Sequence, residues 1–356
     1  MLFRRTPNAL GRIRNGVQAG LGDLLAALLA LPERSRQVCQ QNDTHEQIKR
    51  CLTIPSQCIH RDNTLPATWA KRDADEFRRD EPRLARRISQ RYELCLGNLL
   101  VKHHWIPFAP DEPFHYNVHA GIDVGGRHNT TAMLCVGHGF ANPQGDIVYR
   151  PEEIPVNVQK AEPIPTESLF AGLLASFEVM HGDLSAAGAP VDFNRALFFR
   201  DGHFFGDGDR WNETDALKRL HAEFVARGWI GGNSVWTAVE VLKSAEGWRL
   251  FRNGKDGAEN PVVGRCVFPF DDENIGLVCT TGQPYLPQGT ACPLKFNIID
   301  IAGQANRFEV VRDLVWEADM CFSKPDMGMR LPWILHVADE GALQVSRQYQ
   351  ITGIPV

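Results

Sequence analysis

Two short apolar runs of the sequence each lead to an aspartate that is followed within two residues by glycine. The first run covers residues 119–124 and contains Asp123, and the second covers residues 196–199 and leads to Asp201. Short apolar runs bounded by turn residues predict buried β-strands. Glycine has no side chain, so it leaves open backbone beside each carboxylate. The sequence therefore predicts two buried strands that present an acid at the edge of a sheet.

The second part of the chain alternates between strand and helix patterns. Residues 130–136 are predicted to form a hairpin with the first run, and further strands are predicted at 235–242 and 275–280. Helical periodicity predicts four helices, at residues 166–180, 212–227, 308–322 and 339–349. Thr166 is the predicted N-cap of the first helix. Strands that come first and helices that are interleaved later predict an α/β fold with a mixed sheet.

A cluster of prolines separates this region from the first part of the chain. Pro107, Pro110 and Pro113 stand within seven residues, which no helix or central strand tolerates. An amphipathic helix with a basic face is predicted just ahead of them. We therefore predict a domain boundary here, with one domain at residues 1–112 and a second at residues 113–356.

Charge is distributed unevenly along the chain. Residues 1–104 contain 18 Lys and Arg against 11 Asp and Glu, whereas the remainder contains 20 against 32. This asymmetry suits a phosphate-binding part joined to a metal-binding part, and two differently solvated surfaces would explain it equally well. No apolar run approaches the ~18 residues that span a bilayer, and nine cysteines without a CxxC pair indicate reduced thiols. These features predict a cytoplasmic protein without a membrane partner.

A third acid, Asp339, follows the apolar run at 333–338 and is expected to open the last helix. Carboxylates at the ends of strands and helices can converge on Mg²⁺ or Mn²⁺, because these ions prefer oxygen ligands. Two such ions about 4 Å apart can act together on an in-line phosphodiester displacement. Each aspartate alone is more often a turn or capping residue, so the hypothesis of a metal site rests on Asp123, Asp201 and Asp339 together.

Four motifs of the second part, taken in order, resemble the PIWI domain of Argonaute proteins. They are Ala-Gly-Ile-Asp-Val-Gly-Gly at 120–126, Phe-Arg-Asp-Gly at 199–202, Gln-Gly-Thr-Ala at 288–291 followed by Pro293-Leu294, and Leu331-Pro332 leading to Ala338-Asp339. The resemblance covers about residue 118 to the C-terminus. It implies the RNase H fold, a mixed sheet flanked by helices, and cleavage of a nucleic acid strand paired to a short guide. One departure is Cys292, which stands where the family has a lysine.

The family's catalytic set is Asp-Glu-Asp with a fourth Asp or His. By this resemblance Asp123 is the first aspartate, Asp201 is the second and Asp339 is the fourth member of the set. The same three residues are the implied ligands of a two-metal site with Mg²⁺ or Mn²⁺.

The glutamate of the set lies, in the family, on a mobile loop between the first two aspartates and just before a helix. Four residues of this chain are candidates: Glu152, Glu153, Glu162 and Glu167. We select Glu162, because it directly precedes the helix expected near Thr166. Glu167 is better explained as an acidic residue of that helix's first turn.

The basic first part resembles the pocket of the Argonaute MID domain that holds the 5′ phosphate of the guide. The matching residues are His45, Lys49, Gln57 and Lys102, in the order of the family. His45 and Lys49 are four residues apart, so they share one helix face, and both can donate to phosphate oxygens. In the family the terminal carboxylate also reaches this pocket through a metal, which assigns Val356 the same role here. Taken singly, each cation would be interpreted as a solvated surface residue.

The region before this pocket departs from the family. Only 44 residues precede His45, whereas a complete MID domain has a further strand-rich half there. We therefore expect a partial α/β MID-like domain ahead of the PIWI-like domain. The chain would then be a minimal MID–PIWI protein, a split protein whose missing half comes from a second polypeptide, or a truncated product.

The leading functional hypothesis is a guide-directed, divalent-metal-dependent endonuclease whose partners are a short guide and a complementary target strand. One alternative is a catalytically silent module that binds guide and target and acts with a partner effector. Another is an RNase H-like nuclease of a different lineage. The three aspartates in place favour the enzyme, and the MID-like residues argue against the other lineage. RNA and DNA are both compatible with the resemblance, because they carry the same phosphates.

Overall fold

The computed structural model describes residues 28–31, 57–60, 112–125, 131–141, 148–155, 163–188, 191–206, 210–245, 247–254, 257–284, 286, 291–320, 329–339 and 341–342. At residues 28–31, 57–60, 131 and 148–155 only the backbone is described. These residues belong to two compact units. The larger unit contains every described residue from Glu112 onward. The smaller unit contains two parallel strands, β1 (Leu28–Leu31) and β2 (Gln57–His60).

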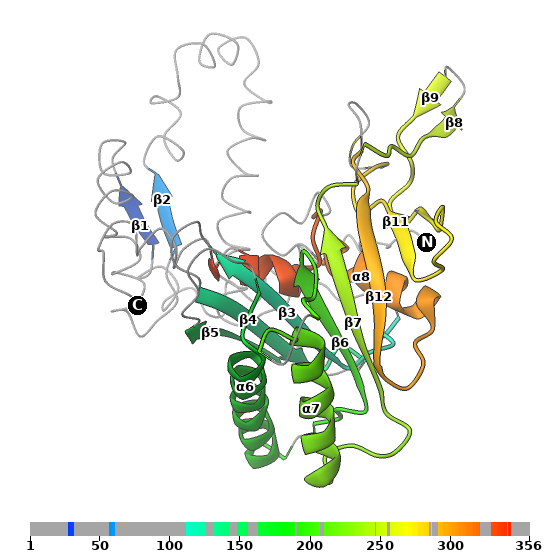
Figure 1. Cartoon of the computed structure of the whole chain (residues 1–356). Coiled ribbons are helices and arrows are strands. Elements are labelled where there is room, and N and C mark those ends of the chain that lie inside the picture. The colour runs from blue at the N-terminus through cyan, green and yellow to red at the C-terminus, as the bar shows by residue number, and fades with distance from the viewer. Residues whose placement is uncertain are drawn as a thin grey trace. The chain divides into compact units, whose positions relative to one another are not determined.

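An eight-stranded mixed sheet forms the larger unit (Figure 1). In order across the sheet the strands are β10 (Cys266–Val267), β11 (Ile275–Val278), β12 (Leu294–Ala302), β7 (Val235–Leu242), β6 (Arg195–Asp201), β3 (Val118–Gly125), β4 (Thr131–His138) and β5 (Val148–Pro155). The central strands β3, β6 and β7 are parallel to one another. All other neighbouring strands pair antiparallel. A separate hairpin joins β8 (Arg252–Gly254) to β9 (Gly257–Glu259).

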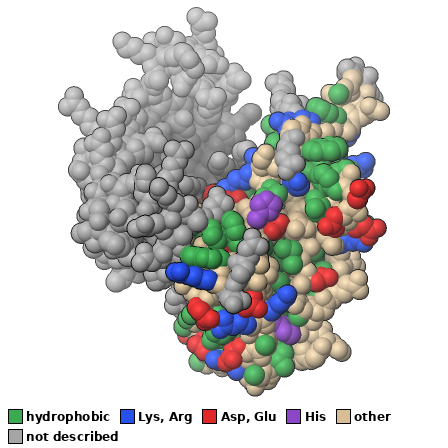
Figure 2. Space-filling view, viewed as in Figure 1, with side chains coloured by type: hydrophobic (Ala, Val, Ile, Leu, Met, Phe, Trp, Pro, Cys, Tyr) green, Lys and Arg blue, Asp and Glu red, His purple; other side chains and the backbone are tan. Residues whose placement is uncertain are grey.

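Helices cover both faces of this sheet (Figure 1). On one face lie α6 (Thr166–Ala186) and α7 (Glu213–Ala226), which pack into a common core with β3, β4, β6 and β7. On the other face lie α8 (Arg307–Asp319) and a helical segment that covers residues 333–339 and 341–342. Acidic and basic side chains are interleaved over the exposed surface of α6 and α7 (Figure 2), as in the ion pairs Glu167–Arg219 and Glu178–Arg227.

Strand β3 divides its side chains between the two faces, because successive side chains of a strand point to opposite sides. The core beneath α6 and α7 receives the even-numbered residues Val118, Ala120 and Ile122. The odd-numbered residues face α8 and the 333–339 segment: His119 bonds to Glu317 of α8, and Gly121 lies against Ile334. Asp123 belongs to this second set. The two-residue period of β3 therefore places Asp123 on the face of the sheet that α8 covers.

Most of the predicted elements are present. The hairpin of β3 and β4 is confirmed, as is the strand at 235–242. The helix predicted at 212–227 is α7, whose N-cap Asn212 accepts a hydrogen bond from the backbone of Asp215. Gly228 follows this helix with a φ of +70°, the left-handed conformation that favours glycine at a helix end.

Two local predictions were wrong. Thr166 is not the N-cap of α6: the cap position is Pro165, and the Thr166 hydroxyl is engaged by the backbone of Asn212. Asp339 does not open the last helix, because the apolar run ahead of it is itself helical from residue 333. The first helical hydrogen bond runs from His336 N to the carbonyl of Pro332, which places Asp339 in the second turn.

No helix among the described residues is both long enough and apolar enough to cross a membrane.

Candidate active site and metal centre

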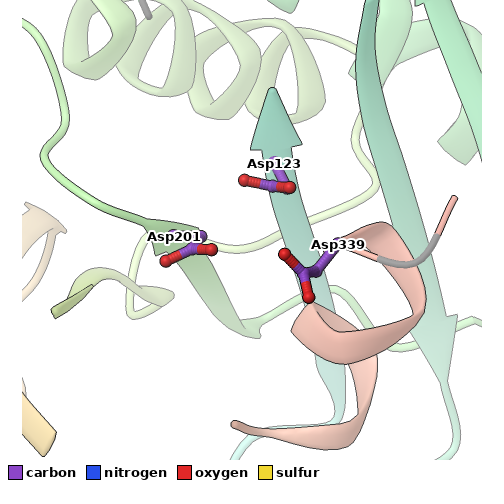
Figure 3. A group of neighbouring side chains, drawn as sticks. All are labelled: Asp123, Asp201 and Asp339. Carbon is purple, nitrogen blue, oxygen red and sulfur yellow. The ribbon is translucent and has the colours of Figure 1, made fainter. Parts of the chain in front are cut away.

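Three aspartates from distant parts of the sequence meet at one edge of the sheet (Figure 3). In the parallel register of β3 and β6, Ile122 lies opposite Arg200, so Asp123 and Asp201 come next and end side by side. Asp339 reaches the same point from the helical segment at 333–339. One carboxylate oxygen from each of the three aspartates lies within 4.8 Å of the others. The structure thus brings together the three aspartates that the sequence singled out.

Two glycines of β3 let the last helical segment approach the strand closely. A Cβ on Gly121 would lie 2.8 Å from the Cα of Leu335 and would overlap the carbonyl group of Ile334. A Cβ on Gly125 would lie 2.8 Å from the Cβ of Ala342. Cβ atoms do not tolerate such distances, so the helix packs directly on the backbone of β3. This close approach is what places Asp339 beside Asp123.

Asp123 has a strongly raised pKa. It is only 8% exposed, and burial together with the charge of Asp201 raises its pKa from 3.8 to about 6. The Arg200 guanidinium opposes this shift from a distance of 3.9 Å, and the charge of Asp339 adds to it. The ionised form of Asp123 is therefore disfavoured in this site.

Arg200 connects the acidic site to the opposite face of the sheet. It is 2% exposed, its Nε donates to Glu213 Oε2 at 3.2 Å, and one of its terminal nitrogens faces Asp123. Glu213 is fully buried at the start of α7, and it also accepts a hydrogen bond from the backbone nitrogen of Ile164. Burial raises the pKa of Glu213 and Arg200 counteracts the shift. The bond to Glu213 thus holds the positive charge of Arg200 close to Asp123.

Lys243 is a further residue of the site that sequence analysis missed. It directly follows β7, and its Nζ lies 2.5 Å from Asp201 Oδ2 and 3.0 Å from Asp339 Oδ1. Burial lowers the pKa of Lys243, but the hydrogen bonds and charges of Asp201 and Asp339 outweigh burial and raise it overall. A sequence signal existed, because Lys243 stands at the end of a strand next to the one that carries Asp201.

The candidate glutamates lie in different settings. Glu162 lies outside the described residues. Glu152 and Glu153 belong to β5, the edge strand that pairs with β4. Glu167 lies in the first turn of α6 and forms an ion pair with Arg219, which lowers the pKa of Glu167. This pairing explains Glu167 without a role in the site.

Of the residues predicted to hold a guide 5′ phosphate, only Gln57 is among the described residues. Gln57 is the first residue of β2 and pairs in register with Leu28 of β1. His45, Lys49, Lys102 and Val356 lie outside the described residues.

A positive charge lies next to the position where the family's lysine is replaced. The Arg330 guanidinium donates to Cys292 Sγ at 3.3 Å and also to the backbone carbonyl of Lys243. Thr280 donates to the carbonyl of Arg330 at 2.6 Å, which holds this residue in place. Cys292 lacks the positive charge of a lysine, and the Arg330 guanidinium supplies a positive charge beside it.

The donor set fits a hard divalent cation. All three ligands are carboxylates, they are close enough to share an ion, and Mg²⁺ and Mn²⁺ prefer oxygen ligands. The cationic Nζ of Lys243, bonded to two of the three acids, shows that the site attracts a positive charge. Arg200 and Lys243 supply two positive charges beside the three acids.

Comparisons with known proteins show the fold. Neither a protein-family model nor a curated protein matches the sequence. Among solved structures, the chain is similar to Clostridium butyricum Argonaute bound to a guide DNA and a 19-mer target DNA, with 17% identity and a TM-score of 0.60. The match covers 90% of this chain and 37% of that chain, so this chain spans little more than a third of its length. The chain therefore has an Argonaute-like fold, and the predicted RNase H-like mixed sheet flanked by helices is confirmed.

Proposed function

We propose that this chain is a guide-directed, divalent-metal-dependent endonuclease that cleaves a nucleic acid strand paired to a short guide. The observation that carries the proposal is the convergence of Asp123, Asp201 and Asp339 at the end of two parallel strands. A second support is the fold, because the Argonaute compared above was solved with both a guide and a target strand.

In this proposal the aspartates hold Mg²⁺ or Mn²⁺ through their carboxylate oxygens. When bound, two such ions activate the attacking water and stabilise the leaving 3′ oxygen of an in-line displacement. Asp123 and Asp201 provide a rigid base for the site, because Asp123 lies within the paired strand β3 and Asp201 ends β6. Arg200, fixed by Glu213, favours the ionised form of Asp123 that a metal requires.

Glu162 is proposed as the fourth acid, supplied once a guide–target duplex is bound. Glu162→Gln should then slow cleavage of a bound duplex and leave guide binding unchanged. Glu153→Gln is the matched comparison, because Glu153 lies on β5 in the same segment between the first two aspartates. Cleavage that survives Glu162→Gln but is lost in Glu153→Gln would identify Glu153 as the fourth acid.

The guide is proposed to be held at its 5′ phosphate by His45, Lys49, Gln57 and Lys102, with the terminal carboxylate of Val356 nearby. The support is the order of these residues in the sequence and their resemblance to the MID pocket. Cations near phosphate oxygens form charge-assisted hydrogen bonds that are stronger than neutral ones. The nucleic acid that copurifies with the protein tests this, because its length, 5′ group and sugar identify the guide.

The decisive experiment is cleavage of a labelled target by guide-loaded protein, with and without EDTA. Asp123→Asn, Asp201→Asn and Asp339→Asn should each abolish cleavage in Mg²⁺ or Mn²⁺ and leave guide binding intact. Asp183→Asn is the matched control, because Asp183 is an exposed residue of α6 on the opposite face of the sheet. It should cleave like the wild type.

Wild-type protein that binds guide and target but does not cut in Mn²⁺ would contradict the nuclease proposal. That result would favour a silent guide- and target-binding module that acts with a partner effector. Cleavage that persists in EDTA would contradict the metal dependence.

A further inference from the structure

The ammonium group of Lys243 pairs with both Asp201 and Asp339, two of the three acids that are proposed to bind metal. Its Nζ is within hydrogen-bond distance of both carboxylates, at 2.5 Å and 3.0 Å. One carboxylate oxygen of each of the three aspartates lies within 4.8 Å of the others, so two cations held by the same pair of oxygens would repel each other strongly. A divalent ion that binds Asp201 and Asp339 together therefore requires the ammonium to leave.

The geometry of Lys243 allows this movement without a change in the fold. Its backbone is held on one side by the end of β7 and on the other by Arg330, whose guanidinium donates to the Lys243 carbonyl. Its side chain is 42% exposed, and the ammonium stands at the end of a flexible four-carbon stem. The charge can thus swing towards solvent while the backbone stays in place.

Two cations of the chain, Arg200 and Lys243, lie close to the three acids, and they differ in how firmly they are held. Asp123 faces Arg200 at 3.9 Å, and Asp201 and Asp339 share Lys243. Each of the three acids is therefore close to a cation of this same chain. Arg200 is 2% exposed and bonded to buried Glu213, so it cannot withdraw as Lys243 can. Of these two cations, Lys243 is the one that a metal ion can replace.

Resting on the proposed function, we propose that Lys243 is a tethered counter-cation that competes with a divalent metal ion for Asp201 and Asp339. In the metal-free protein the ammonium relieves the repulsion among the carboxylates and stabilises the site. When metal binds, the ammonium is displaced. Lys243 therefore acts as a positioning residue that sets the metal concentration at which the site fills.

The test is a titration of full-length, EDTA-stripped protein with Mn²⁺, in which the electron paramagnetic resonance signal reports free Mn²⁺. Lys243→Met keeps the length of the side chain and removes its charge, so it should bind Mn²⁺ about tenfold more tightly than the wild type. Lys243→Arg retains the charge and should stay within about threefold of the wild type. Lys218→Met removes an exposed charge of α7, on the other face of the sheet, and should have no effect.

Thermal unfolding in EDTA gives a second readout that does not depend on activity. Lys243→Met should melt at a lower temperature than the wild type, because the carboxylates lose their counter-charge. Mn²⁺ should raise the melting temperature of Lys243→Met more than that of the wild type. If Lys243→Met does not fold, Lys243→Gln serves in both measurements.

The outcomes separate this inference from the proposed function. Equal or weaker Mn²⁺ binding by Lys243→Met than by the wild type overturns the competition and leaves the metal site standing. Mn²⁺ binding that appears in Lys243→Met but not in the wild type or in Lys243→Arg supports the competition strongly. Absence of binding in the wild type and in every variant overturns both the competition and the metal dependence.

Discussion

Gly121 of β3 lies so close to Ile334 that a Cβ on the glycine would overlap the carbonyl group of Ile334. This contact sets the distance between the strand that carries Asp123 and the helical segment that carries Asp339. The convergence of the three aspartates therefore depends on a residue that has no functional group.

We predict that Gly121→Ala pushes the helical segment away from β3 and separates Asp339 from Asp123. Overpacking of this kind should lower the free energy of unfolding by about 1–3 kcal/mol and reduce Mn²⁺ affinity. Gly182→Ala is the matched control, because Gly182 lies within α6 with nothing within 4 Å of an added Cβ. It should stabilise the protein by about 0.5–1 kcal/mol. Denaturant unfolding measures the free energy of unfolding of both variants. Equal effects of the two variants would show that the helical segment moves away from Gly121 without a cost in free energy.

Removing the charge of Glu213 should take away the buried carboxylate that pairs with Arg200. We expect Glu213→Gln to lower the free energy of unfolding by about 3–5 kcal/mol. The reason is that breaking a buried ion pair leaves the remaining charge poorly compensated in a poorly solvated place. Glu223→Gln, on the exposed side of the same helix, breaks the pair with Arg227 and should cost about 0.2–1 kcal/mol. Urea unfolding compares them. Similar losses for the two variants would mean that Asp123, 3.9 Å away, compensates Arg200 on its own.

Asp123 should make the metal-free protein less stable as the pH rises. Its pKa is raised to about 6 in the folded state from 3.8, so the folded state holds the proton more tightly than the unfolded state. The resulting stabilisation is present below pH 3.8 and is lost as the pH rises through 6. A shift of this size corresponds to roughly 3 kcal/mol.

Asp123→Asn removes this titration, so in EDTA it should be more stable than the wild type at pH 8 by up to about 3 kcal/mol. The difference should shrink as the pH falls and nearly vanish at pH 4. Thermal unfolding across this range measures it. An advantage of Asp123→Asn that is the same at pH 4 and pH 8 would contradict the raised pKa.

Lys49→Ala and Lys102→Ala test the proposed guide pocket. Each should remove a charge-assisted contact worth roughly 1.5–3 kcal/mol, which is about tenfold to a hundredfold in affinity for a 5′-phosphorylated guide. A 5′-hydroxyl guide should be nearly unaffected, and Lys218→Ala should change neither. Fluorescence anisotropy gives the affinities. An equal loss for both guides would identify the lysines as general backbone contacts.

The amino-acid sequence by itself determined the elements that depend on local patterns. The apolar run at residues 119–124 and the alternation at 235–242 indicated strands, and the amphipathic pattern of residues 212–227 indicated α7. The prediction of an N-cap from residue type was wrong at Thr166. Its side chain could cap a helix, but its hydroxyl is bonded to Asn212, 46 residues away. The two aspartates at strand ends could be found because their position depends on strands that the sequence predicts.

The tertiary structure decided which other residues join the site. Lys243 bonds to Asp339, which lies 96 residues away in the sequence, and Arg200 bonds to Glu213 across a loop. Neither pairing follows from the spacing of these residues in the chain. The close packing of Gly121 on Ile334 joins segments more than 200 residues apart. Such contacts depend on how helices and strands pack, and the free energy of packing belongs to the assembled core rather than to any one segment. The charges that balance the three aspartates are therefore a property of the fold.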